Sequence, residues 1–400
     1  MKTQRKLLGL PKTVVFLGLV SFFNDIAGEA IYSVMPVFLT TVIGVGPQFL
    51  GLLEGTAESL SSVLKYLSGA LSDRYKSREP FVVAGYGLGA IVRPIMGLVT
   101  AAWQVLALRS LDRVGKGIRT APRDAWLASV TTPTTRGKIF GFHQAMDDAG
   151  AIVGPLLATL FLYFMPDRYR TLFLLTAIPG LLSIPLIFAA QRVKRAEQAR
   201  PELVKSSPKT PAASKLRDRG AVPPRFKLFL VTVLVFTLGN STDAFLLLRF
   251  KTIGVAIFWI PLLYAALHVV KMVSSAVCGS LSDRIGRRQC ITLGWLVYAL
   301  AYLGIASTSS ISLTIGIFLF YGLYYGLTEG PQKAFVADLV SPQHHGSAYG
   351  LYNLMIGIGA LPASLIGGIL WQHIGGAAPF YFGAVLSSLA MILFKILIKE

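Results

Sequence analysis

Ionisable side chains inside long apolar stretches are the residues of this sequence that could do chemistry. The first stretch contains Asp25 and Glu29, spaced four residues apart. The second contains Glu54 and Glu58 at the same spacing. Residues four apart share one helical face, so each pair would present two carboxylates side by side. Such charges cost at least about 2.5 kcal/mol each in a bilayer unless they are paired or wet, which indicates a functional site.

Two arginines lie at a depth similar to that of these carboxylates, counting about 1.5 Å per residue from the ends of the stretches. Arg93 and Arg109 are therefore predicted to form one network with all four carboxylates, Asp25, Glu29, Glu54 and Glu58. A carboxylate that exchanges an arginine partner can load and release a proton, so Asp25 and Glu58 are the predicted protonation sites. The alternative is a permanent salt-bridge cluster that only holds helices together.

The composition predicts a membrane protein that crosses the bilayer many times. Of 400 residues, 54% are hydrophobic and only 14% are charged. The net charge of +19 does not indicate nucleic-acid binding, because the Lys and Arg residues lie mainly between the apolar runs. Their expected partner is the anionic inner leaflet. We therefore expect an all-α membrane protein with no nucleic-acid partner.

Twelve apolar windows are long enough to span a membrane, at about 20 residues each. Their limits are 12–42, 47–70, 81–101, 104–128, 139–163, 171–190, 228–249, 257–280, 290–308, 312–336, 347–371 and 379–397. The first window is longer than needed and contains Pro36, which predicts a tilt or a kink there. Basic residues cluster before the first window and after the second, so the positive-inside rule predicts that both termini are cytoplasmic.

The chain divides into two related halves. Residues 191–227 are rich in Lys, Arg, Pro, Ala and Ser, and form a predicted basic cytoplasmic linker between a six-helix bundle at 1–190 and another at 228–400. Nearly the same ten residues as at 69–78 return at 279–288, at the same place in the second half. Two such pseudo-symmetric bundles predict a cavity between the halves.

Three motifs give the sequence a resemblance to the major facilitator superfamily along its whole length. The superfamily's loop motif GxLxDRxGRR is complete at 279–288 and partial at 69–78, where Lys76 replaces its second glycine. The fourth-span motif resembles residues 109–117, and the fifth-span signature of proton-driven antiporters resembles Gly150-Ala-Ile-Val-Gly154-Pro155. The resemblance implies two six-helix bundles and transport.

Within the superfamily, the chain resembles a bacterial permease subgroup. The similarity lies in the fourth-span stretch DRVGKGIRTAPRD at 112–124, in 140–143 and in 321–329. It implies a bacterial inner membrane and supplies no substrate.

The resemblance also implies a gating role for the repeated loops. Asp73 and Asp283 are placed to accept hydrogen bonds from the N-terminus of a facing helix and to pair with nearby arginines, which would latch the cytoplasmic side. The alternative for the arginines, Arg74 and Arg284 among them, is that they only set the topology. In the fifth span, Gly150 and Gly154 most simply allow close helix packing. Pro155 would bend the same helix.

The second half offers fewer polar candidates. Asn240, Asp243, His268 and Glu329 are candidate substrate or coupling residues, although Glu329 could simply pair with Lys333 four residues on.

A separate possibility at His268 is a metal. His268 and Met272 share a helical face and could bind Cu(I), as in the HxxxM pattern of copper-importing members of the superfamily. The seventh window lacks the methionines that accompany that pattern, so no metal site is expected.

These observations predict a secondary active transporter that moves a small solute by alternating access. Protons are the expected coupling ion, with export by antiport favoured and no cofactor. The alternative of the same fold is an importer of copper or of a metal chelate such as a siderophore. An enzyme is not expected because no HExxH, GxSxG or paired catalytic Asp motif occurs. A non-transporting sensor or assembly factor is a third class, and a monomer is expected.

Overall fold

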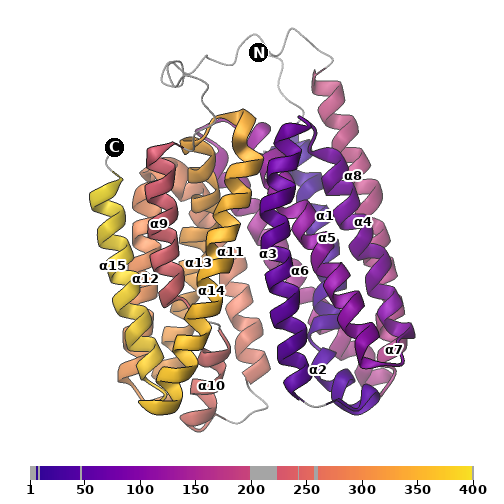
Figure 1. The fold of residues 1–400 in the computed structure, drawn as a ribbon, viewed down its shortest axis with the longest axis vertical. Coiled ribbons are helices and arrows are strands. Elements are labelled where there is room, and N and C mark those ends of the chain that lie inside the picture. Colours follow the sequence, from indigo (N-terminus) through magenta and orange to yellow (C-terminus); the bar gives the residue numbers. More distant parts are fainter. Residues whose placement is uncertain are drawn as a thin grey trace. The chain divides into compact units, whose positions relative to one another are not determined.

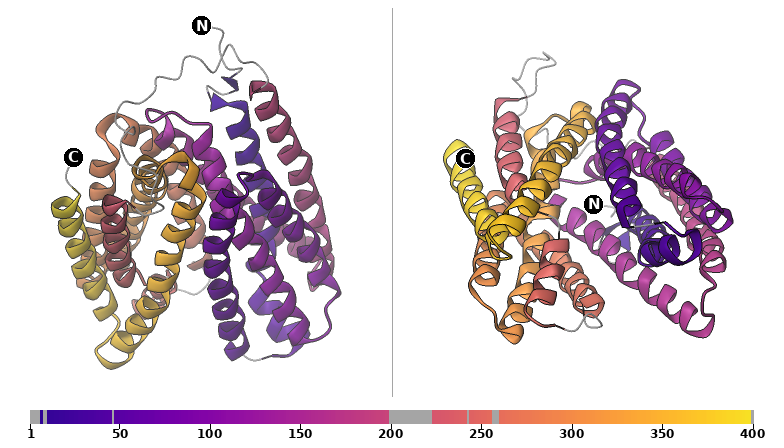
Figure 2. Two further views of the ribbon diagram at one scale, coloured as in Figure 1. Left: turned by 45° about the horizontal axis from the view of Figure 1, so that its top comes forward. Right: turned by 60° about the horizontal axis from the view of Figure 1, so that its bottom comes forward.

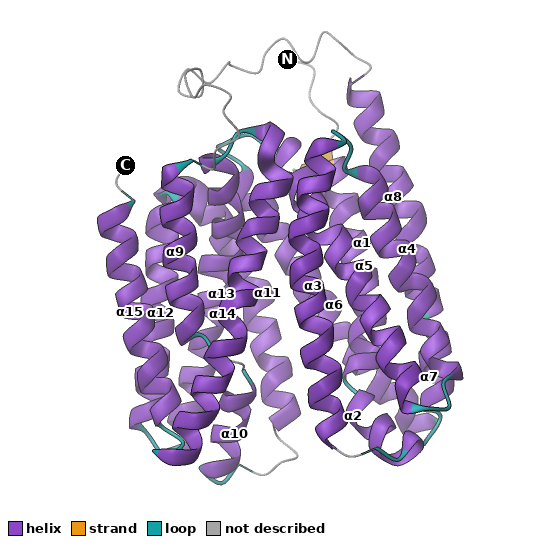
Figure 3. Cartoon of the chain, viewed as in Figure 1, coloured by secondary structure: helices purple, strands orange, loops and turns teal. Residues whose placement is uncertain are grey.

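The computed structural model describes residues 6–7, 10–45, 47–198, 223–241, 243–255 and 260–398. Almost all of this chain is helical (Figure 3). The only strands within the described residues are β1 (Lys6–Leu7) and β2 (Leu10–Pro11), which pair antiparallel just before the first helix. The predicted all-α architecture is confirmed.

The helices of the first half are coloured from indigo to magenta in Figure 1. In chain order they are α1 (Lys12–Tyr32), α2 (Met35–Phe38), η1 (Leu39–Ile43), α3 (Pro47–Arg74), α4 (Glu79–Ile95), η2 (Met96–Leu98), α5 (Ala102–Ser129), α6 (Arg136–Phe164), α7 (Tyr169–Leu175) and α8 (Ala177–Gln198).

The helices of the second half run from pink to yellow in the same figure. They are α9 (Pro224–Gly239), α10 (Ala244–Thr252), α11 (Ile260–Ile285), α12 (Arg287–Ser307), α13 (Ile311–Leu339), η6 (Pro342–His344), α14 (His345–His373) and α15 (Ala378–Leu397). Proline in the first turn helps to start α4, α9 and α15, because its fixed φ suits a helix and its missing N–H would lack a partner there.

Each of the twelve predicted windows corresponds to one helix or to consecutive helices. Nine helical segments among the described residues are long and apolar enough to cross a membrane. The other three windows correspond to α3, α5 and the α9–α10 pair. Charged residues lower the hydropathy of α3 and α5, and the seventh window is interrupted between Gly239 and Ala244.

The first span is interrupted where the sequence predicted a kink. α1 ends at Tyr32, and a turn at Ser33 and Val34 precedes α2. Proline removes a helical N–H and clashes with the preceding turn, so Pro36 accounts for the break. At the predicted linker, α8 continues to Gln198 and α9 begins at Pro224. The predicted linker residues 199–222 lie outside the described part of the chain.

The contacts divide the chain into two compact units. Unit 1 comprises Met1–Thr131, Gly150–Val222 and Val340–Gly350, and unit 2 comprises Thr132–Ala149, Pro223–Leu339 and Leu351–Glu400. The first turns of α6 therefore pack with the second half of the sequence, and the first turns of α14 pack with the first half.

Within unit 1, α5 packs against α3 and α4, and α1 packs against α8. Within unit 2, α13 packs against α11 and α12, and α15 packs against α9 and α12. The long helices of each unit lie roughly along a common direction (Figure 2).

Candidate functional site

A buried cluster of arginines and one aspartate lies inside unit 1. Arg93 of α4 donates from Nε to Asp112 Oδ1 of α5 at 2.9 Å, and Arg109 Nη1 lies 3.5 Å from Asp112 Oδ2. Arg93 also donates to the carbonyl and the side-chain oxygen of Asn24 at 2.6 and 2.9 Å. All three charged side chains are at least nine-tenths buried. Asp112 therefore joins the two predicted arginines, although sequence reasoning did not select it as a site residue.

Asp25 lies at the edge of this cluster. Asn24 Nδ2 donates to Asp25 Oδ1 at 2.7 Å, so the asparagine that binds Arg93 also binds Asp25. The carboxylates of α1 face the glycines of α6: a Cβ added at Gly150 would lie 2.6 Å from the carbonyl oxygen of Phe22 and 2.9 Å from Asp25 Cβ.

The same close packing occurs one turn further along α6. A Cβ added at Gly154 would lie 2.8 Å from the carbonyl oxygen of Ile26 and 3.2 Å from Glu29 Cβ. The two glycines thus let α6 approach α1 beside both carboxylates. Pro155 follows inside α6. The close packing that the sequence predicted for these glycines is confirmed.

The second helical pair of carboxylates is placed differently. Glu58 pairs with Lys65 of its own helix at 3.5 Å, and its side chain is 54% exposed. No contact to Arg93 or Arg109 is recorded for it among the described residues. The side chain of Glu54 lies outside the described part of the chain. The partner that joins the two arginines is Asp112 rather than Glu58.

Buried and partly buried tyrosines surround the polar residues of the seventh span in unit 2. Asp243 accepts from the hydroxyls of Tyr321 and Tyr325 at 2.9 and 2.8 Å. Asn240 donates to the Tyr324 hydroxyl at 3.3 Å and accepts from Tyr298 at the same distance. Sequence reasoning selected Asn240 and Asp243 but missed the tyrosines. Their spacing of three and four residues on α13 was the available signal.

An ion pair joins the two halves of the sequence within unit 2. Asp148 of α6 lies 3.6 Å from His268 Nδ1 and 3.9 Å from Lys271 Nζ, both on α11. The Lys271 ammonium also lies 3.8 Å from the centre of the Tyr325 ring. Among the residues that the structure describes, no group of three or more His, Cys, Asp or Glu side chains could hold a metal ion.

The first repeated loop binds the start of α14 within unit 1. Asp73 Oδ1 accepts from the backbone N–H of Gly346 at 3.0 Å, and Oδ2 accepts from the N–H and hydroxyl of Ser347 at 2.6 and 2.8 Å. Arg78 donates to the carbonyls of Ala125 at 3.0 Å and Pro342 at 2.9 Å. The carboxylate satisfies N–H groups that no helical turn can pair.

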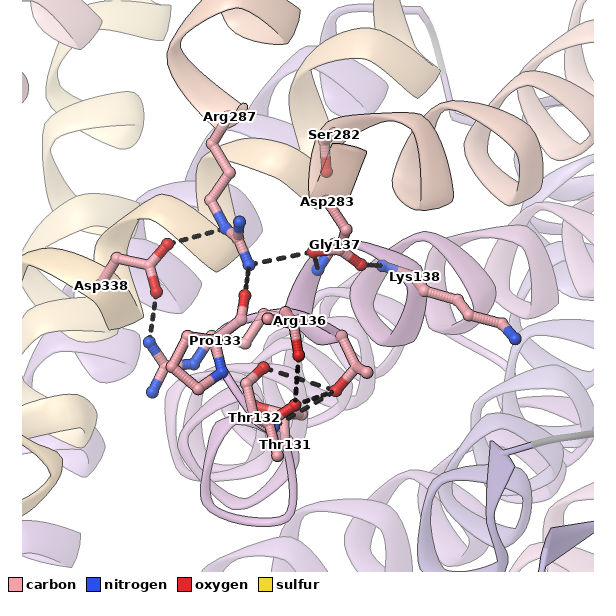
Figure 4. Close-up of polar contacts among 12 residues, drawn as sticks. Thr131, Thr132, Pro133, Arg136, Gly137, Lys138, Ser282, Asp283, Arg287 and Asp338 are labelled. Carbon is pink, nitrogen blue, oxygen red and sulfur yellow. Dashed lines mark hydrogen bonds and ion pairs between the residues drawn. The ribbon is translucent and has the colours of Figure 1, made fainter. Parts of the chain in front are cut away.

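The second repeated loop binds the start of α6 in the same way within unit 2 (Figure 4). Asp283 accepts from the N–H groups of Gly137 and Lys138 at 2.9 and 2.8 Å. Arg287 Nη2 donates to Asp283 at 3.0 Å and also to the carbonyl of Pro133. The helix-capping role predicted for Asp73 and Asp283 is confirmed by these contacts.

An extra carboxylate makes the two loops unequal. Asp338, at the end of α13, forms ion pairs with Arg136 and with Arg287, the latter at 2.7 Å (Figure 4). The corresponding position in the first half is Ser129, which has no charge. The second loop is therefore held by a four-residue ion-pair cluster of Arg136, Asp283, Arg287 and Asp338.

The predicted arginines that follow the two aspartates lie outside these clusters. Arg74 and Arg284 are exposed, and no hydrogen bond is recorded for either within the described residues. Burial lowers the pKa of the Arg78 guanidinium, while the Asp73 and Glu79 carboxylates oppose the shift.

Three features define a polytopic membrane transport protein. They are the apolar helices, the buried charges in both halves of the chain, and the repeated loops whose aspartates cap helix starts. The family model described as Major Facilitator Superfamily matches residues 17–360 and, in a second match, residues 269–400. The chain belongs to this superfamily. It is thus a membrane transporter rather than an enzyme. The family that the sequence motifs indicated is confirmed.

Relatives and solved structures agree with this assignment. The chain is 36% identical over 394 residues to the uncharacterized MFS-type transporter MJ1317 of Methanocaldococcus jannaschii, covering 96% of this chain and 94% of the relative. It is 22% identical to the multidrug resistance protein MdtH of Photorhabdus laumondii subsp. laumondii, over 86% of this chain and 82% of the relative. The crystal structure of the human organic anion transporter MFSD10 shares the fold, with a TM-score of 0.74, 17% identity and coverage of 96% and 99%.

Proposed function

We propose that this protein is a proton-coupled secondary transporter that exports a small solute across a bacterial inner membrane by alternating access. The observation that carries the coupling proposal is the placement of Asp25 and Glu29 against the two glycines of α6, beside the buried Arg93–Asp112–Arg109 cluster. A carboxylate at the edge of a cationic cluster can be charged or protonated according to whether an arginine is near.

In this proposal the gate is formed by the two repeated loops, whose aspartates cap the starts of α14 and α6. Alternating access requires contacts that form in one state and break in another. Asp73 and Asp283 hold the first turns of α14 and α6 through a few hydrogen bonds each, which can open at modest cost. Gly150, Gly154 and Pro155 let α6 move against α1 without losing contact.

Export by proton antiport is favoured over import by two observations. The Gly150–Pro155 stretch resembles the signature of proton-driven antiporters, and the multidrug resistance protein MdtH is a distant relative. In this proposal the monomer lies in the membrane with both termini cytoplasmic and needs no cofactor. No described contact favours the copper or metal-chelate alternative, since His268 pairs with Asp148.

The test is transport by purified protein in proteoliposomes with and without a pH gradient. Candidate solutes would be organic cations, organic anions, sugars and metal chelates. The Asp25→Asn variant should lose gradient-driven accumulation while it still exchanges labelled solute across the membrane at equilibrium. Glu58→Gln is the matched control, because Glu58 is exposed and bound to Lys65, and it should retain most of the flux.

Accumulation that is unchanged after nigericin collapses the pH gradient would contradict proton coupling. Wild-type flux in Asp25→Asn would assign the carboxylates of α1 to helix packing instead.

A further inference from the structure

A cavity of about 260 Å³ lies inside unit 2, between α9, α13 and the parts of α6 and α14 that belong to this unit. Its lining includes Phe236, Asn240, Tyr324, Tyr325, Glu329 and Lys333. The volume of a ligand pocket in a protein is usually at least about 300 Å³. This cavity is slightly smaller, so it suits a small molecule of roughly ten to twelve heavy atoms. The wall combines four aromatic rings, four side-chain amides, one carboxylate and one lysine.

Glu329 is the carboxylate of this wall. Its Oε2 atom is buried and has no hydrogen-bond partner among the described residues. No ion pair of Glu329 is found among the described residues, although Lys333 lies four residues away on α13. A buried carboxylate oxygen without a partner is costly, and a cationic ligand would satisfy it.

The neighbouring tyrosines are held with their rings in place. The Tyr324 hydroxyl accepts from Asn240, and the Tyr324 and Tyr325 rings lie 4.8 Å apart between centroids. Tyr325 donates to Asp243 at 2.8 Å, which makes its ring more electron-rich. The Lys271 ammonium, 3.8 Å from the centre of that ring, shows that this aromatic group already attracts a cation.

The charges around the cavity have a negative excess when the histidines are neutral. Four carboxylates belong to this region, and two lysines oppose them. The carboxylates are Asp147, Asp148, Asp243 and Glu329; the lysines are Lys271 and Lys333; the histidines are His143 and His268. A zwitterion would leave this excess unchanged and an anion would increase it. A monocation reduces it.

We propose that this cavity binds a small organic ammonium ion that carries an apolar, preferably aromatic, body. The ammonium group pairs with Glu329 and lies against the face of Tyr324, and the body packs on Phe236. The inference deepens the proposed function, on which it rests, by assigning the substrate class to organic cations. The residues that recognise the ligand then belong to unit 2, whereas the carboxylates of α1 belong to unit 1.

The first experiment measures ligand selectivity at equilibrium. Isothermal titration of the purified full-length protein would compare four ligands that share a phenyl ring on a two-carbon chain: 2-phenylethylammonium, the neutral 2-phenylethanol, zwitterionic phenylalanine and anionic 3-phenylpropionate. The cation should bind at least about tenfold more tightly than each of the others. Equal affinity for the cation and the alcohol, preference for the zwitterion or anion, or no binding of the cation would overturn the proposal.

Four variants locate the site. Glu329→Gln should remove most of the preference for 2-phenylethylammonium over 2-phenylethanol. Lys333→Gln, on the same helix, removes a positive charge and should strengthen cation binding. Tyr324→Phe keeps the ring and should retain the selectivity, whereas Tyr324→Leu should reduce it several-fold.

Glu329→Gln and Lys333→Gln should change cation binding in opposite directions. A loss of folding would weaken binding in both variants, so the two explanations can be distinguished. A loss of selectivity in Lys333→Gln as large as that in Glu329→Gln would overturn the assignment of the site. If one variant misfolds, the ligand selectivity of the wild-type protein still tests the proposal.

Ligand binding tests the cation site, and solute flux tests the proposed function, so the two proposals can fail separately. Selective cation binding without any flux in proteoliposomes would contradict the proposed function and leave this site standing. Proton-coupled flux of an uncharged or anionic solute, with no selective binding of the cation, would overturn this inference and leave the proposed function standing.

Discussion

Lys76 and Gly286 occupy the same position in the two repeated loops, and both have a positive φ. Lys76 has φ of 52°, in the left-handed region that side chains enter at a cost. Gly286 has φ of 92° and ψ of 141°, which lies outside the left-handed region and close to conformations that only glycine adopts readily. The two loops therefore turn differently, and Lys76 replaces glycine in a backbone conformation that a lysine can reach.

This difference predicts unequal effects of alanine at the two positions. Gly286→Ala should lower the free energy of unfolding by about 1–3 kcal/mol, because alanine does not fit this backbone conformation. Lys76→Ala should change it by less than about 0.5 kcal/mol, since the strain is already present in the wild type. Thermal unfolding of both variants in detergent would measure this. Equal losses would mean that the two backbones are equally strained.

At the scale of elements, the proposed gate lies at two helix starts. The first turns of α6 and α14 each begin with N–H groups that lack helical partners, and Asp283 and Asp73 supply acceptors for them. The arginines that bind the adjoining carbonyls come from different positions of the repeat, namely Arg287 in the second loop and Arg78 in the first. The two helix starts are thus held by arginines from different positions of the repeat.

Removal of either capping carboxylate should destabilise the protein. We expect Asp73→Ala and Asp283→Ala each to lower the free energy of unfolding by about 1–2 kcal/mol, as for other lost N-caps. Arg74→Ala and Arg284→Ala are the neighbouring controls on exposed side chains, and should stay within about 0.5 kcal/mol.

The same thermal assay would report these changes. A loss in Arg284→Ala equal to that in Asp283→Ala would mean that the loop charge matters rather than the cap.

For the whole molecule, the distribution of charged loops predicts the orientation. The loop between α5 and α6 is followed at once by Arg136 and Lys138 in the first turn of α6, whereas the loop between α12 and α13, around Ser309, has no basic residue. The positive-inside rule therefore puts these two loops on opposite sides of the membrane, with the former in the cytoplasm.

Cysteine labelling of intact cells tests this orientation. Thr134 and Ser309 are both exposed, and Cys278 and Cys290 are buried, so they can be replaced to give a background without thiols. Ser309→Cys should react with a membrane-impermeant maleimide in intact cells, whereas Thr134→Cys should react only after the cells are opened. Reaction of Thr134→Cys in intact cells would reverse the assigned orientation.

The sequence by itself determined the positions of the helices, the repeat between the halves and the capping roles of Asp73 and Asp283. These features are local, because apolar runs, prolines and a repeated decapeptide can be read along the chain. Counting residues also predicted that Arg93 and Arg109 share one network, and both contact Asp112. The family could be inferred for the same reason, since its motifs are short and contiguous.

Only the tertiary structure decided which charged groups meet. Arg93 and Arg109 bind Asp112 instead of Glu58, Glu58 points to Lys65, and the tyrosines of α13 surround Asp243. Depth along a helix does not give the rotation of that helix about its axis, and rotation is set by packing against neighbours far away in the sequence. The cavity beside Glu329 exists for the same reason, because its wall combines helices from across the chain.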